Sequence, residues 1–204
     1  TLRSSSAASD VYKRQVQSSV AEDFTTKFEA AVRSLEMGNG DKEGVAVGPL
    51  IDQNAAASVC DFIDDAVSKG AKLIAGGAKS PLGDCFVEPT ILTNVSRDMR
   101  VFSEEIFGPV APIFTFETEV EAIEMANDTQ FGLAAYFYSR DIGRIYRVAE
   151  KLEYGIIGIN EGIISNEMAP FGGVKESGNG REGSKYGLDD YLDIKYMCIG
   201  GIHQ

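Results

Sequence analysis

The sequence predicts an α/β fold in which a mostly parallel β-sheet is flanked by helices. Amphipathic helical segments alternate along the chain with short apolar segments, a pattern typical of parallel strands joined by crossover helices. The segments 110–116 and 156–160 are almost continuously apolar, as expected for strands that are buried on both faces. Because 44% of the 204 residues are hydrophobic, the chain can bury a core of this kind.

Charge and hydropathy argue against nucleic-acid and membrane partners. The chain has 31 acidic and 19 basic residues and a net charge of −12. A nucleic-acid partner is not expected, because affinity for nucleic acid depends on Lys and Arg side chains that neutralise phosphates. A membrane partner is not expected either, since no apolar run reaches the roughly 18 residues of a membrane-spanning helix.

The cysteines and the histidine also limit the chemistry. Cys60, Cys85 and Cys198 are odd in number and widely spaced, which favours a reducing compartment over a disulfide framework. His203 is the only histidine and stands one residue from the C-terminus. We therefore expect no metal site and no histidine-based catalysis.

The elements follow in order from the N-terminus. Residues 1–15 are Ser- and Ala-rich and slightly basic, and we expect them to be a disordered tail that is foreign to the folded domain. Ser19 and Glu22 have capping-box spacing, and the apolar residues that follow at steps of three and four predict a helix closed by Gly38. Asp52 is expected to cap a second helix that ends before Gly70.

Strands are predicted next at 72–75, 86–87, 91–92 and 110–116. Pro89 and Pro112 interrupt these segments and favour sheet edges or bends there. Thr118 with Glu121 predicts another capped helix to about Asn127, followed by a strand at 133–139.

Asp141 is expected to cap a helix over 142–152, which precedes the strand at 156–160. The Gly-rich segment 161–186 is predicted to be a long loop, in the position where open α/β sheets bind ligands. Residues 191–199 alternate between apolar and polar side chains and predict a strand at the end of the chain.

Three segments carry candidate chemistry. Residues 178–183 fit the G-x-G-x-x-G pattern, but a loop precedes them where a dinucleotide site needs a strand, so we expect a turn or a short helix entry. Glu104 and Glu105 precede a Gly-Pro turn, where a carboxylate can accept two hydrogen bonds from a diol such as ribose. The alternative is a solvated acidic pair. Phe171 is either a pocket wall or ordinary core.

Several motifs, in order along the chain, resemble the C-terminal half of NAD(P)-dependent aldehyde dehydrogenases. The principal motifs are E-E-I-F-G-P at 104–109, G-L-A-A at 132–135, Asn160 after its strand, and P-F-G-G-V-K-x-S-G-x-G-R-E-G at 170–183. The resemblance covers the chain from about Val16 to its end. The segments 136–141, 162–166 and 183–187 are similar to succinate-semialdehyde dehydrogenases in particular.

The resemblance implies roles for four residues. Glu105 would bind the hydroxyls of the nicotinamide ribose of NAD or NADP, and Phe107 would lie beside the nicotinamide. Ser165 would hydrogen-bond the distal carboxylate of the substrate, and Phe171 would line the substrate tunnel. The implied reaction is oxidation of a small aldehyde, with succinate semialdehyde as the expected substrate.

The chain also departs from the family pattern. The nucleophilic cysteine of the family lies in a loop just upstream of the strand that resembles 16–18, and this chain has D-V-Y-K-R-Q there at 10–15. The catalytic glutamate motif is missing too. We therefore expect a fragment that is inactive alone, with a partial catalytic domain at 16–187.

The remaining expectation concerns assembly and compartment. Residues 188–204 would form an oligomerisation strand and tail that joins copies of the chain into a homo-oligomer. An alternative from a different class is a non-catalytic interaction module that uses the same strand, and another is an aldehyde dehydrogenase of other specificity. The expected location is the cytoplasm or the mitochondrial matrix.

Overall fold

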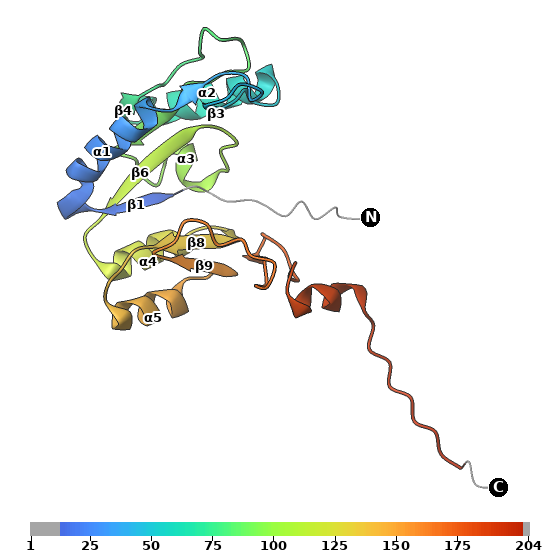
Figure 1. Cartoon of the computed structure of the whole chain (residues 1–204). Helices are drawn as coiled ribbons and strands as arrows, with labels where there is room; N and C mark the ends of the chain where they lie inside the picture. Colours follow the sequence, from blue (N-terminus) through green and yellow to red (C-terminus); the bar gives the residue numbers. More distant parts are fainter. Residues whose placement is uncertain (1–12, 202–204) are drawn as a thin grey trace. The chain divides into compact units, whose positions relative to one another are not determined.

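The computed structural model describes residues 13–201 and divides them into two compact units, at 13–129 and at 130–201 (Figure 1). The predicted α/β class is confirmed. In the first unit a four-stranded sheet has the order β1-β6-β5-β4. These strands are Arg14–Gln17, Val110–Phe116, Thr90–Thr93 and Lys72–Ala75 respectively. β1 and β5 run parallel to β6, and β4 is antiparallel at one edge.

Helices cover both faces of this sheet. Neighbouring residues of a strand point to opposite faces, and Ile91 and Leu92 of β5 are both fully buried. Ile91 belongs to an apolar cluster with α1 (Ala21–Arg33), whereas Leu92 belongs to a cluster with α2 (Gln53–Ser68). Two shorter helices, α3 (Arg100–Ser103) and α4 (Glu119–Asn127), flank β6 in the sequence.

Three predicted N-caps are confirmed. The side chains of Asp52, Thr118 and Asp141 accept hydrogen bonds from the backbone N–H three residues further on, at 2.7, 3.2 and 2.7 Å. They begin α2, α4 and α5 (Ile142–Lys151). Each cap satisfies a backbone donor that the first helical turn leaves unpaired.

The predicted limits of the first helix are wrong. Ser18–Val20 form a 3₁₀ turn, the N-cap residue Val20 has no capping side chain, and Ser18 Oγ instead donates to the carbonyl of Phe116 at 3.1 Å. α1 also ends at Arg33 and does not reach Gly38. Residues 36–37 cannot continue the helix because they form a short strand, β2 (Glu36–Met37), which pairs in parallel with β3 (Val45–Val47).

Two strand predictions also need correction. Pro112 lies within the central strand β6, opposite Leu92. The ladder continues because proline removes only one N–H, and β1 pairs with the next residue, Ile113. Residues 86–87 contribute only an isolated bridge between Lys79 and Val87, not a strand.

The N-terminal boundary of the fold lies earlier than residue 16. β1 begins at Arg14, and Arg14 and Gln15 pair with Ile113 and Phe114 of β6. Lys13 Nζ donates to the carbonyl of Asp128 at 2.6 Å. Three residues assigned to the tail therefore take part in the fold, while residues 1–12 lie outside the described residues.

The second unit contains a strand–helix–strand motif. β8 (Ala134–Phe137) and β9 (Ile156–Ile159) pair in parallel, and α5 connects them. The strand predicted at 133–139 is shorter than expected, since β8 covers only Ala134–Phe137. Leu133 separates β8 from β7 (Phe131–Gly132), which pairs with a different partner, β10 (Val174–Lys175). The long loop predicted at 161–186 is present apart from β10 and the start of a 3₁₀ helix at Lys185–Tyr191.

The strand predicted at 191–199 is not formed in the single chain. Tyr191 ends the 3₁₀ helix, and residues 192–201 have no regular secondary structure. A strand needs a neighbour that accepts its backbone hydrogen bonds, and the described residues provide none for this segment. Its role in assembly stays a prediction. Within the described range, no helix is both long and apolar enough to cross a bilayer.

The buried centre of the sheet gives a stability prediction. Ile91→Ala should lower the free energy of unfolding of the 204-residue chain by about 2–5 kcal/mol, because it leaves a cavity in a fully buried position. Ile51→Ala is the matched control, since Ile51 is 94% exposed. Urea unfolding of both variants measures the difference, and equal midpoints would contradict the described core.

Candidate functional site

The candidate site residues of the first unit lie on the 104–109 loop, which connects α3 to β6. Ile106 is 3% exposed and packs in the cluster around α2, whereas Phe107 is 71% exposed and Glu105 is partly buried. One buried side chain thus anchors the middle of the loop. The aromatic ring that follows it is presented to solvent.

A glycine fixes the far end of this loop. A Cβ at Gly108 would collide with the Cγ2 atom of Val59 on α2, so only glycine allows this close approach. The Gly108 N–H donates to the carbonyl of Ile106 at 2.9 Å, and the Thr90 N–H of β5 donates to the carbonyl of Pro109 at 2.8 Å. These contacts hold the loop against both α2 and the sheet.

Glu104, the first of the two adjacent glutamates, is held by an ion pair. Arg100 donates to both oxygens of Glu104, from Nε at 2.9 Å and from Nη2 at 3.0 Å. This hydrogen bonding lowers the pKa of Glu104 below its ordinary value. Glu104 is therefore one half of a bidentate ion pair and not simply a solvated carboxylate.

The candidate site residues of the second unit lie on the loop after β9. Asn160 has a left-handed backbone with φ of 57°, and its side chain exchanges two hydrogen bonds with the backbone of Ser139, at 2.8 and 2.7 Å. Ser165 lies further along and is exposed. Within residues 13–201, its hydroxyl makes no hydrogen bond, so it is not used to satisfy loop backbone groups.

Phe171 is held by backbone pairing. Its N–H donates to the carbonyl of Glu182 at 2.8 Å, and the Glu182 N–H donates back at 2.6 Å. The G-x-G-x-x-G segment at 178–183 leads through Ser184 into the 3₁₀ helix, and Ser184 Oγ caps it by accepting from Tyr186 N–H. The segment thus turns into a short helix, as expected, although β10 ends at Lys175, three residues before the first glycine, where only a loop was predicted.

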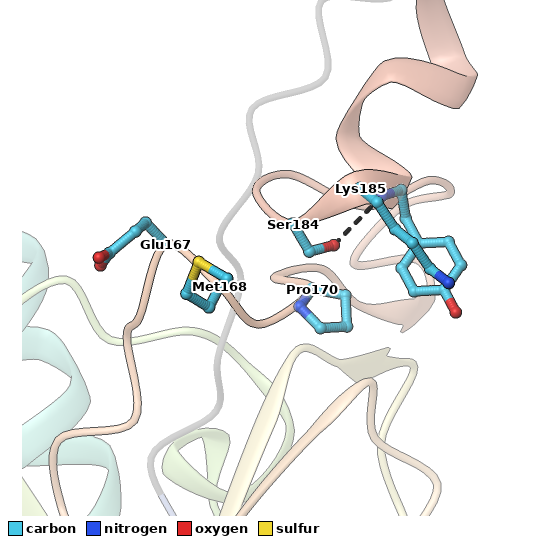
Figure 2. A pocket seen from close by; sticks show the side chains of 6 residues that line it. Glu167, Met168, Pro170, Ser184 and Lys185 are labelled. Atoms are coloured by element: carbon cyan, nitrogen blue, oxygen red, sulfur yellow. Dashed lines mark hydrogen bonds between the residues drawn. The ribbon is translucent and has the colours of Figure 1, made fainter.

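An open hollow of about 490 Å³ lies beside this segment in the second unit (Figure 2). Its lining is largely apolar, with one cationic and one anionic side chain, and comprises Glu167, Met168, Pro170, Ser184, Lys185 and Tyr186. Sequence reasoning did not single it out. The only available signal was that its two halves lie within the Gly-rich loop and the G-S-K-Y-G motif at 183–187.

The four predicted site residues fall into two pairs. Glu105 and Phe107 share the 104–109 loop of the first unit, and Ser165 and Phe171 share the loop after β9 in the second. The described residues contain no cluster of three or more potential metal ligands.

The three cysteines all carry free thiols. Cys60 lies on α2 and packs against the core, and burial raises the pKa of its thiol. A thiol of this kind is poorly suited to nucleophilic attack, which requires the thiolate. Cys85 is partly buried and Cys198 is exposed.

The comparison with known families decides the wider identity. The model of the aldehyde dehydrogenase family matches residues 7–197. The chain belongs to the aldehyde dehydrogenase family. As an aldehyde dehydrogenase it is shorter than its relatives, because it spans about two fifths of the length of the curated relatives it matches.

Three relatives are similar at 57–59% identity. Glutarate-semialdehyde dehydrogenase of Pseudomonas aeruginosa is 59% identical, over 92% of this chain and 39% of its own length. The 3-sulfolactaldehyde dehydrogenase of Pseudomonas putida is 58% identical, over 92% and 38%. The NADP⁺-dependent succinate-semialdehyde dehydrogenase of Escherichia coli is 57% identical, over 91% and 38%.

Two solved structures share the aldehyde dehydrogenase fold of the chain. Succinate-semialdehyde dehydrogenase from Burkholderia pseudomallei superposes with a TM-score of 0.88 at 57% identity, and the match covers 91% of this chain and 38% of the other. Betaine aldehyde dehydrogenase from Staphylococcus aureus, in complex with NAD⁺, superposes with a TM-score of 0.84 at 39% identity, over 89% and 37%.

The close approach at Gly108 gives a prediction for the loop. Gly108→Ala should destabilise the 204-residue chain by about 1–3 kcal/mol, because the added methyl group overpacks the contact with Val59. The effect should be smaller in a Val59→Ala background, where the space is open. Urea unfolding of the two single variants and the double variant measures this coupling.

Gly40→Ala is the control for this cycle, since a Cβ there meets no atom within 4 Å. Strict additivity of Gly108→Ala and Val59→Ala would show that the two residues are not in contact.

Proposed function

We propose that the chain is part of an oxidoreductase that oxidises an aldehyde with an acidic far end, using NAD⁺ or NADP⁺. The observation that carries this proposal is the 104–109 loop, where the buried Ile106 and the close packing of Gly108 on Val59 hold the backbone that carries Glu105 and the exposed Phe107. The proposed product is the corresponding acid, with succinate semialdehyde converted to succinate.

In the proposed complex Glu105 accepts hydrogen bonds from the nicotinamide ribose. An ionised carboxylate is an acceptor with two oxygens, which matches a pair of neighbouring hydroxyls. The ring of Phe107 is uncovered and offers a flat apolar surface to the nicotinamide. The cofactor supplies hydride-acceptor chemistry, and both NADP⁺ and NAD⁺ occur among the similar proteins.

The proposed substrate class follows from Ser165 and from the relatives. Succinate and glutarate semialdehydes carry a carboxylate at the end remote from the aldehyde, and 3-sulfolactaldehyde carries a sulfonate there. A hydroxyl without an internal partner, as at Ser165, can donate a hydrogen bond to such an anion. Phe171 would supply an apolar wall for the carbon chain.

We infer that the thiolate nucleophile and the glutamate base of the reaction are not among these 204 residues. The burial and raised pKa of Cys60 argue against a nucleophilic role for it. The chain alone is therefore expected to be inactive.

The proposed location is the cytoplasm or the mitochondrial matrix. The exposed apolar side chains of the tail, such as Ile194 and Tyr196, support the proposed homo-oligomer. They also support a second candidate function, an interaction module without catalysis.

Glu105→Gln tests the cofactor role in the full-length dehydrogenase. The variant should weaken cofactor binding by about 1.5–3 kcal/mol, because an amide is a poorer acceptor than a carboxylate. Cofactor titration together with steady-state kinetics measures the change. Glu43→Gln, which alters an exposed loop glutamate, is the control. Unchanged affinity and turnover in Glu105→Gln would refute the proposed cofactor site.

Ser165→Ala tests the substrate role. The ratio of kcat/KM for succinate semialdehyde to that for butanal should fall about 5- to 150-fold, which corresponds to about 1–3 kcal/mol, because only the acidic substrate uses the hydroxyl. Ser68→Ala on α2 is the control. A loop that is merely loosened would affect both substrates alike. An unchanged ratio would refute the proposed role of Ser165 and leave the substrate of this aldehyde dehydrogenase unassigned.

A further inference from the structure

We infer that Arg100 is a positioning residue for the 104–109 loop and sets the placement of Glu105 and Phe107 for the cofactor. This inference rests on the proposed function, since the loop is taken to hold the nicotinamide. Arg100 stands five residues before Glu105, on α3.

Two contacts fix Arg100 independently of the loop. Its backbone N–H donates to Asp65 Oδ2 at 2.9 Å. Its guanidinium lies over the ring of Phe62, 4.2 Å from the ring centroid. Because Phe62 is buried in the core cluster around α2, the guanidinium has a rigid support.

The support continues through a second charged pair. Asp65 also pairs with Lys69 at 2.9 Å, and Lys69 Nζ donates to the carbonyl of Asp98 at 2.7 Å. The hydrogen bonds from Lys69 and from the Arg100 N–H lower the pKa of Asp65, so this carboxylate is ionised at neutral pH. The end of α2 is thereby tied to the residues on either side of Met99, where α3 begins.

From this support Arg100 holds the first residue of the loop. It clamps both oxygens of Glu104, and the Glu104 N–H donates to the Arg100 carbonyl at 2.9 Å. Both side-chain and backbone atoms of Glu104 are therefore fixed, and Glu105 follows it directly. α3 has only four residues, and a helix of that length has little stability of its own.

The fork geometry of this pair distinguishes it from an ordinary surface ion pair. A single exposed ion pair contributes little to stability, but a bidentate arginine stacked on an aromatic ring fixes orientation as well as distance. Lysine is a point charge without the planar fork, so it cannot reproduce the contact. The chain offers a matched comparison at Arg33 and Glu29 of α1, an i, i+4 pair at 2.7 Å that lies far from the loop in the sequence.

The kinetic test uses the full-length dehydrogenase. Arg100→Gln should raise the cofactor KM about tenfold, the change that corresponds to 1.4 kcal/mol, with a smaller change in kcat. Arg100→Lys should not restore it. Glu104→Gln should have a similar effect, and the double variant should be no worse than either single variant, because both remove the same contact. The control Arg33→Gln should leave the cofactor KM unchanged.

A second measurement does not require the cofactor. Hydrogen–deuterium exchange in the 204-residue chain should be faster at the Glu104 and Gly108 amides in Arg100→Gln, while the Ala56 amide in the first turn of α2 stays protected. Unchanged exchange at both loop amides would overturn the inference. The inference would also be overturned if Arg100→Gln exchanged faster at these amides but kept an unchanged cofactor KM, while Glu105→Gln raised that KM. If Glu105→Gln is silent as well, the proposed function fails and the inference fails with it.

Discussion

The pairing of β6 with a parallel strand on each side is the constraint on which the first unit depends. Its neighbours β1 and β5 come from segments far apart in the sequence, and β6 is buried over most of its length. A strand paired on both edges cannot shift along the sheet without breaking two ladders. The 104–109 loop ends where β6 begins, so the position of its last residues is fixed by the sheet. Ile106 and Gly108 also pack against α2, which fixes the middle of the loop.

The predictable parts of the fold are those set by neighbours in sequence. The caps at Asp52, Thr118 and Asp141 involve an N–H three residues away, so the sequence contains the whole interaction. The wrong predictions concern distant partners. Ser18 bonds to Phe116 across 98 residues, within a 3₁₀ turn that occupies the place of the expected cap at Ser19. Pro112 is tolerated because of the register of two other strands, which no local pattern reveals.

In the candidate site, too, local features were predicted and contacts between distant residues were not. Glu105, Phe107, Ser165 and Phe171 were proposed from motif position, and the structure places each pair on one loop. The ion pair of Glu104 was not predicted, although Arg100 stands four residues before it and this spacing favours a pair on a helix. The support from Phe62 and Asp65 could not be predicted, since it requires knowing how α2 packs against α3.

The pairing of Glu104 has an electrostatic consequence for its neighbour. Two ionised carboxylates on successive residues repel each other, and a dinucleotide with its phosphates adds further negative charge, in a chain whose net charge is already −12. The guanidinium of Arg100 offsets the charge of Glu104 through two hydrogen bonds. In the proposed cofactor complex, Glu105 would then face less repulsion from its neighbour. The guanidinium of Arg100 therefore has two effects on the loop, because the hydrogen bonds that orient Glu104 also neutralise its charge.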